Sequence, residues 1–193
     1  VLIYYHFASL SIALALMGIV TTAIYQLYIS QYKTWVSQDI VTEMQQSGRF
    51  AIDTMTREMQ LAGYDLAPNL PAIEKAVMEA TASKFTFIST DTTITTVNER
   101  TRKISFYYDS TNQRLKMDVT TWDKSGASYG SAVTGTLAEN VTALSFLYFD
   151  DQGNTPATVD DVRRIKVSLS VQTARKDPVT GNYKSMTLVT EAR

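Results

Sequence analysis

The feature that most constrains this chain is a long N-terminal run without charge. Residues 1–32 contain no Asp, Glu, Lys or Arg, and all 18 basic and 19 acidic residues lie from Lys33 onward. About 20 apolar residues are enough to cross the hydrocarbon core of a bilayer as a helix. The run is therefore long enough to span a membrane, or to occupy another environment from which water is excluded.

The rest of the chain has the composition of one small water-soluble domain. The formal net charge is -1, and no basic run is available to neutralise phosphates, so we expect no nucleic-acid partner. The chain has no cysteine, which excludes disulfides and thiolate chemistry. A cleaved signal peptide is disfavoured, because no basic residue precedes the apolar core and the core exceeds the usual 7–15 residues. A helix that anchors the domain to a membrane is the simplest interpretation.

Small residues recur along the uncharged run at helical spacing. Intervals of three and four residues place side chains on one face of a helix. The set is Ala8, Ser11, Ala15, Gly18 and Thr22. A narrow face of small residues lets a second helix approach closely where water supplies no driving force for association. We predict a helix-packing surface here; the alternative is a helix that merely happens to be rich in alanine.

Four aromatic residues continue the same spacing at the end of the uncharged run. They are Tyr25, Tyr28, Tyr32 and Trp35. Aromatic side chains at the end of a span usually mark the interface between membrane and water. The alternative is aromatic packing between neighbouring helices of an assembly, and we include these four residues among the candidate assembly contacts.

The helical pattern continues past the first charge. Apolar and small residues form a stripe, namely Val36, Ile40, Met44, Ser47, Ala51, Met55, Met59 and Ala62, and charged residues occupy the opposite face. No proline occurs before Pro68, and Gly63 is a candidate C′ residue. The spacing predicts one helix of about 60 residues, ~90 Å long at 1.5 Å per residue. Its uncharged half is 1–32, its amphipathic half is 33–65, and Val36, Ile40, Met44, Ala51, Met55 and Met59 are expected to contact a sheet.

Residues 66–193 have the composition of a β-domain. Alternating, β-branched and aromatic runs predict strands at 84–90, 92–97, 103–109, 114–119, 141–150, 163–173 and 183–191. Turn residues at 109–112, 151–153 and 177–181 separate neighbouring runs and predict hairpins. We expect an α+β fold in which one antiparallel sheet covers the stripe of the helix. The composition of 73–80 favours a short helix.

No constellation for catalysis is present. The sole histidine, His6, lies in the uncharged run without a carboxylate nearby, and neither a Gly-x-Ser-x-Gly turn nor a phosphate-binding glycine loop occurs. The carboxylates Asp150, Asp151, Asp160 and Asp161 are the only calcium candidates. Their spacing does not match the twelve-residue calcium loop, and a polar hairpin turn explains the first cluster equally well. We expect no enzyme, no metal and no cofactor.

Several segments resemble type IV pilin-like proteins, and are most similar to PilW-type minor pilins and secretion-system pseudopilins. The resemblance covers 12–20, 45–65, 137–150 and 161–169, and is most specific at Arg57-Glu-Met-Gln-Leu-Ala-Gly-Tyr64. It implies a pilin fold, with a long N-terminal helix on an antiparallel sheet, and it favours an extended segment at 73–80. It also implies a bacterial inner-membrane stage, a prepilin peptidase, an assembly ATPase, and an extracellular filament built from copies of the chain or other pilins.

The chain departs from that family near its start. Such pilins usually begin Phe-Thr-Leu-Ile-Glu, and alignment on 12–20 places the glutamate at Ser9; counted from Val1, the fifth residue is Tyr5. Neither register supplies a carboxylate to pair with the amine of a neighbour. The helix proline of the family is replaced by Gln26. A filament subunit is our first expectation, and the alternatives are an anchored periplasmic or surface domain and a pseudopilin that forms no long filaments.

Overall fold

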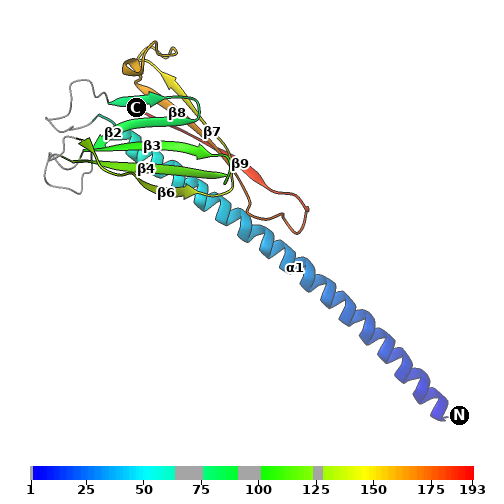
Figure 1. Cartoon of the computed structure of the whole chain (residues 1–193). Coiled ribbons are helices and arrows are strands. Elements are labelled where there is room, and N and C mark those ends of the chain that lie inside the picture. The colour runs from blue at the N-terminus through cyan, green and yellow to red at the C-terminus, as the bar shows by residue number, and fades with distance from the viewer. Residues whose placement is uncertain (1, 64–75, 91–100, 124–127) are drawn as a thin grey trace.

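A computed structural model describes residues 2–63, 76–90, 101–123 and 128–193. It contains one long helix, α1 (Leu2–Gln60), followed by a domain of β-strands at one end of the helix (Figure 1). The expectation of an α+β chain with a long N-terminal helix and antiparallel strands is confirmed. The strand predicted at 92–97 falls outside the described residues.

Helix α1 runs without a break for 59 residues. Its last turn tightens, because the N–H groups of Leu61 and Ala62 donate to carbonyls three residues earlier, at 3.2 and 3.1 Å. Gly63 then takes a left-handed conformation (φ 75°), and its N–H donates to the carbonyl of Ile88 at 2.9 Å. The glycine therefore has the conformation of a C′ residue, but its N–H bonds to strand β2 and not to a carbonyl of the helix.

Two antiparallel sheets form the domain, where the sequence pattern predicted one. The six-stranded sheet contains β1 (Val77–Ala80), β2 (Lys84–Thr90), β3 (Thr101–Asp109), β4 (Arg114–Asp123), β5 (Ser128–Tyr129) and β6 (Val133–Ala138). The three-stranded sheet contains β7 (Val141–Phe149), β8 (Arg164–Gln172) and β9 (Ser185–Ala192), and a 3-10 turn, η1 (Val159–Asp161), lies between β7 and β8. Strands β1 to β4 follow one another as neighbours, and β6 pairs with β4.

Two local predictions need correction. Strand β6 was not predicted, because Ala138 is its only buried residue and no apolar alternation marks it. For 73–80, composition favoured a short helix and the resemblance favoured an extended segment; the described part contains strand β1, which pairs with β2 from Val77 to Ala80, so the helix is wrong there and the extended conformation is confirmed. Pairing with a neighbouring strand therefore outweighs the helical propensity of this segment.

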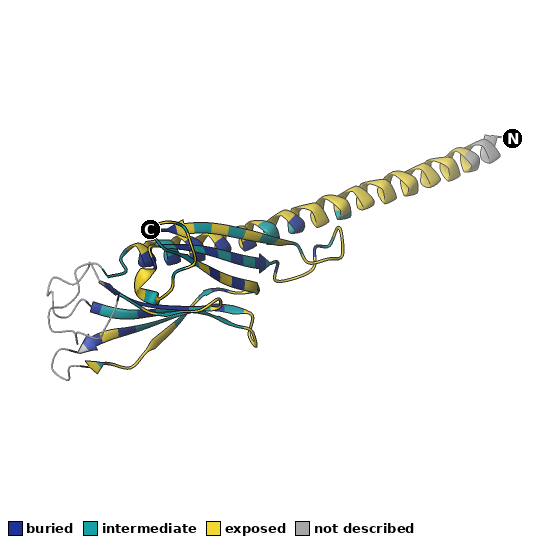
Figure 2. Cartoon of the chain, turned by 90° about the horizontal axis from the view of Figure 1, so that it is seen from above, coloured by how far each residue is buried: buried dark blue, intermediate teal, exposed yellow. Residues whose placement is uncertain are grey.

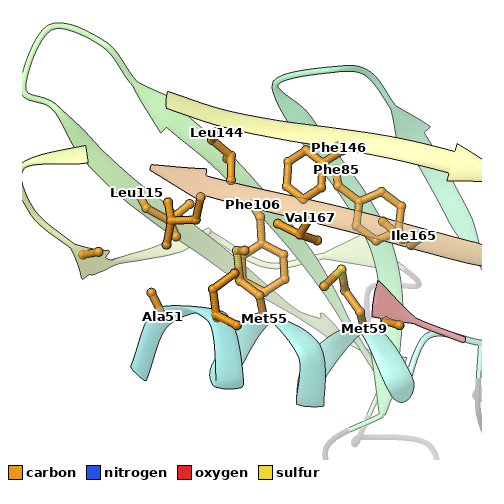
Figure 3. Close-up of a cluster of buried hydrophobic side chains, with 14 of the residues drawn as sticks. Ala51, Met55, Met59, Phe85, Phe106, Leu115, Leu144, Phe146, Ile165 and Val167 are labelled. Carbon is orange, nitrogen blue, oxygen red and sulfur yellow. The ribbon is translucent and has the colours of Figure 1, made fainter. Parts of the chain in front are cut away.

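The core lies between the two sheets and α1. The helix contacts β8 and β9 of the smaller sheet and β2 and β6 of the larger one, while β7 contacts β2, β3 and β4. Figure 3 shows Met55 and Met59 pointing from the helix toward Phe106, Val167 and Ile165. Four phenylalanines fill the space between the sheets; Phe85 lies 5.0 Å from Phe87 and 6.0 Å from Phe146 between ring centroids, and Phe87 lies 5.9 Å from Phe106.

The apolar stripe of the amphipathic half faces this core. Ile40, Met44, Ala51, Met55 and Met59 are buried, and Val36 is half-buried. The charged residues of the other face are exposed, namely Asp39, Glu43, Arg49, Asp53 and Arg57. Lys33 was predicted for that face as well, but helical spacing places it on the side of Ser37, and it is exposed because it lies before the part of the helix that the domain covers. Figure 2 shows the consequence: among the described side chains of α1, the buried ones lie along the part of the helix that is against the domain.

A buried ion pair fixes the C-terminal end of the helix to the larger sheet. The Arg102 guanidinium on β3 donates to the Glu58 carboxylate at 2.6 Å, and the Glu58 side chain is only 10% exposed. A buried carboxylate is tolerated when a well-placed cation pairs with it, and removal of either partner leaves the other charge buried and unpaired. The pair therefore contributes more to the fixed position of the helix end than to net stability.

Gly48 marks the closest approach between the helix and the smaller sheet. A Cβ built at this position would lie 2.8 Å from Leu188 Cδ1, 3.1 Å from Met186 Cε and 3.3 Å from Val171 Cγ2. A glycine inside a helix costs about 1 kcal/mol relative to alanine. Here its missing side chain lets β8 and β9 seat their apolar side chains directly on the helix backbone.

We predict that Gly48→Val destabilises the domain by roughly 2 kcal/mol, because an added branched side chain overpacks the contact with Met186 and Leu188. The matched control is Gly18→Val, since a Cβ at Gly18 meets nothing within 4 Å. Chemical unfolding of the full chain in detergent, followed by near-ultraviolet circular dichroism, measures the difference. Equal unfolding midpoints for the two variants would contradict the close approach.

Candidate functional site: the exposed half of the helix

The uncharged half of α1 has almost no protein cover in this structure. Its described side chains are exposed except that of Ile29, which is half-buried. The exposed set includes the large apolar residues Leu10, Ile12, Leu14, Leu16, Met17, Ile19, Val20, Ile24 and Leu27. The most apolar window of the helix has a mean hydropathy of 1.8 and no buried residue. The helix is long and apolar enough to cross a membrane by length and composition. A surface of this extent needs a dry partner, either lipid or protein.

The small residues predicted for helix packing lie along one side of this half. Ser11, Ala15, Gly18 and Thr22 are exposed, and the described side chains do not include that of Ala8. A shallow groove runs over this side and is lined by Ala15, Gly18, Ile19, Thr22, Ala23 and Gln26. The absence of a Cβ at Gly18 deepens the groove, since nothing fills that space. We call these residues the small-residue groove.

The hydroxyl groups in and beside the groove are satisfied within the helix. Ser11 Oγ donates to the Phe7 carbonyl at 2.9 Å, and Thr22 Oγ1 donates to the Gly18 carbonyl at 2.8 Å. Thr21 makes the same bond to Met17 at 2.8 Å. Because the hydroxyls of Ser11, Thr21 and Thr22 need no water, they can enter a dry environment without being left unpaired.

The aromatic residues lie between the uncovered and the buried parts of α1. Tyr25, Tyr28, Tyr32 and Trp35 are all more than half exposed, and the rings of Tyr32 and Trp35 lie 6.3 Å apart between centroids. They are therefore not part of the domain core. The structure leaves them available for a membrane interface or for a neighbouring helix.

A polar cluster that the sequence pattern did not predict lies where the domain first meets the helix. The connection between β8 and β9, residues 173–184, is here called the junction loop. Lys184 Nζ in this loop donates to Ser37 Oγ on α1 at 2.9 Å and lies 3.0 Å from Asp177 Oδ2. Asp177 is fully buried and also accepts hydrogen bonds from the Val179 N–H and the Thr180 hydroxyl, each at 3.0 Å.

These contacts hold the Asp177 carboxylate in its charged form. The hydrogen bond from the Val179 N–H, the ammonium of Lys184 and the hydroxyls of Ser37 and Thr180 hold the pKa of Asp177 well below its usual range. Sequence reasoning identified Asp177 only as a turn residue. Asp177 is linked to the helix through Lys184, which donates to Ser37. Ser37 and Lys184 are 147 positions apart, so no local sequence pattern predicts their contact.

The calcium candidates serve as turn residues in the described structure. Asp150 Oδ1 accepts hydrogen bonds from the N–H groups of Gln152 and Asn154 at 2.9 and 2.7 Å. Asp161 accepts from the N–H and hydroxyl of Thr158 at 3.1 and 2.9 Å. Asp151 and Asp160 are exposed. Among the described residues, no three Asp, Glu or His side chains gather closely enough to hold a metal ion, and His6 is exposed on the helix.

Comparison with known proteins finds no family model that matches the chain, and no curated protein similar to it. The function therefore has to be inferred from the residues and their arrangement.

We predict that Asp177→Asn flattens the acid dependence of stability. A carboxyl with a lowered folded-state pKa contributes stability that is fully present above its unfolded pKa of about 4 and is lost as the pH falls through the folded-state pKa. The native domain should lose unfolding free energy below about pH 4, and the variant, which already lacks this contribution at neutral pH, should lose less. The exposed Asp151→Asn variant is the control, and urea unfolding between pH 7 and pH 3 measures both. Parallel pH profiles for the Asp177 variant and the native chain would contradict the role assigned to this carboxylate.

Proposed function

We propose that this chain is a structural subunit of a type IV pilus or a similar filament, assembled by packing of N-terminal helices. The observation that carries the proposal is the division of one continuous helix. Its second half is built into a domain core, and its first half is apolar, uncharged and uncovered. A helix of this kind needs two successive dry environments in a filament subunit, namely the bilayer before assembly and the filament core afterwards.

The rigid connection between the two halves supports the same proposal. Helix α1 passes from the uncharged run into the domain without a linker, and the junction loop begins to hold it at Ser37. Helical packing of many copies requires that each domain keep one orientation relative to its helix. A domain that is only tethered to a membrane has no such requirement and is usually joined by a flexible segment.

The resemblance of 12–20, 45–65 and the later segments to PilW-type minor pilins also supports a filament subunit. On this proposal the chain resides in the bacterial inner membrane, is processed by a prepilin peptidase and is extracted by an assembly ATPase. Its partners are copies of itself or other pilins, and its final location is an extracellular filament. The small-residue groove and the aromatic residues are then the surfaces through which neighbouring helices meet.

A second candidate is a single-pass anchored domain or a pseudopilin that forms no long filament. The exposed aromatic residues Tyr25, Tyr28, Tyr32 and Trp35 favour it, because such a group also suits a permanent position at a membrane interface. Electron microscopy of filaments sheared from cells, with mass spectrometry of their protein, separates the two. Recovery of the chain in filaments supports the subunit. Filaments that lack the chain, with the chain retained in detergent-extracted membranes, would support the anchor.

We predict that Ala15→Leu and Gly18→Leu each reduce the number of filaments about tenfold or more. A leucine fills the small-residue groove, and overpacking of a helix contact costs about 1–3 kcal/mol, which is of the order of one decade or more in an association constant. The domain should fold normally in both variants, because neither residue contacts it.

The matched control is Ala13→Leu, which adds the same volume as Ala15→Leu about half a turn away from the groove. Quantitative microscopy of sheared filaments, with the chain level in membranes measured in parallel, gives the readout. Native filament numbers from both groove variants would remove the groove from the assembly interface.

A further inference from the structure

The junction loop is the part of the domain that reaches furthest toward the exposed half of α1, as Figures 1 and 2 show from two directions. Its position along the helix is set by the hydrogen bond from Lys184 to Ser37. Ser37 lies four residues, or about 6 Å, beyond Lys33, the first charged residue of the chain. The loop therefore lies beside the level at which the helix changes from uncharged to charged.

The surface of this region is basic. Arg175 and Lys176 in the loop and Lys33 on the helix are exposed, and none forms an ion pair with a carboxylate in the described residues. Lys33 lies on the same helix face as Ser37, one turn earlier. The only acidic residue of the loop, Asp177, is buried and paired with Lys184.

The nearest other carboxylates lie on the domain side of this region or on another helix face. Glu43 and Glu139 line a groove with Ala174 at the base of the loop, further from the uncharged half of the helix. Asp39 is two residues from Ser37 and so lies on the opposite face of α1. The positive charge of Lys33, Arg175 and Lys176 is therefore not cancelled at the tip of the loop.

Apolar and aromatic side chains accompany these cations. Val179 and Tyr183 in the loop are 60% and 50% exposed, and Lys176 Nζ lies 6.0 Å from the centroid of the Tyr183 ring. On the other side of the helix, at a similar level, Tyr32 and Trp35 are exposed. Aromatic rings beside lysine and arginine at one level are typical of the boundary between a bilayer and water.

We infer that the junction loop, together with Lys33, is a contact surface for the headgroups of anionic phospholipids. The inference rests on the membrane stage of the proposed function. With the uncharged half of α1 in hydrocarbon, Lys33 lies at the boundary and Ser37 about 6 Å above it, within a headgroup layer of roughly 5–8 Å. The loop then rests on the lipid surface and holds the domain there until the helix is extracted.

A single cysteine in the otherwise cysteine-free chain tests this contact. Val179→Cys carries a fluorophore, and the full-length chain is reconstituted in vesicles of phosphatidylcholine alone or with phosphatidylglycerol, each containing lipids with a nitroxide headgroup. Each basic residue near an anionic surface contributes roughly a fivefold factor to the lipid-bound population. We expect clearly stronger quenching in the anionic vesicles, and loss of that difference at ~1 M salt, where the screening length is about 3 Å.

Charge variants make the test specific. Replacement of Lys33, Arg175 and Lys176 by Gln should reduce the quenching at Val179→Cys to the level seen with phosphatidylcholine. The matched control replaces the exposed Arg49, Arg57 and Arg193 by Gln, which changes the net charge equally and should leave the quenching unchanged. A fluorophore at Gln152→Cys, on the β7–β8 connection at the other end of the domain, should not be quenched.

A fluorophore at Ala23→Cys reports insertion independently through lipids with nitroxide on the acyl chain. Quenching at Ala23→Cys without lipid-dependent quenching at Val179→Cys, or equal effects of the two sets of charge variants, would overturn the inference while the membrane stage stands. No quenching at Ala23→Cys would instead refute the membrane stage of the proposed function, and the inference with it.

Discussion

The buried face of α1 between Ile40 and Met59 is the surface on which the rest of the domain depends. Both sheets leave apolar faces that meet the same stripe of the helix, and neither sheet covers the whole core alone. Gly48 sets the distance on one side, because its missing side chain admits Met186 and Leu188 of β9. A domain of this size buries a limited apolar area and is only marginally stable, so the apolar area that one helix buries against both sheets is a large part of its core.

Polar contacts fix the helix at both ends of this buried stretch. Lys184 holds Ser37 where the domain begins, and Arg102 holds Glu58 near the last turn, about 30 Å further along the axis. Apolar packing alone permits small sliding and rotation, whereas charged and hydrogen-bonded contacts have defined partners. The buried part of α1 therefore has a defined position against the sheets. Because the helix continues without a linker, the uncovered part has a defined orientation relative to the domain as well.

Local periodicity was sufficient to predict the elements, but not their tertiary partners. The 3.6-residue stripe from Val36 to Met59 and the alternation of β8 are properties of neighbouring residues, and each could be read directly. Strand β6 lacked such a pattern because only its last residue enters the core. The role of Gly48 and the Ser37–Lys184 contact depend on residues more than a hundred positions apart, for which a single sequence contains no signal. The division into two sheets falls between β6 and β7, where no sequence pattern distinguished a change of sheet from another hairpin. Asp177 accordingly had the same turn signature as Asp150, although only Asp177 is buried.

Two independent boundaries nearly coincide on the helix. The boundary in composition is Lys33, the first charged residue, and the boundary in burial is Ser37, the first buried residue in the described part of the helix. A helix that only supported a soluble domain would gain nothing from an apolar extension, because an exposed surface of that kind promotes aggregation. The extension instead carries no charge over residues 1–32, and the hydroxyls of Ser11, Thr21 and Thr22 bond to its own backbone. The site is thus a property of the whole uncharged half of α1. Its exposed apolar surface, its lack of charge and the internally bonded hydroxyls together favour a partner that excludes water, either lipid or protein.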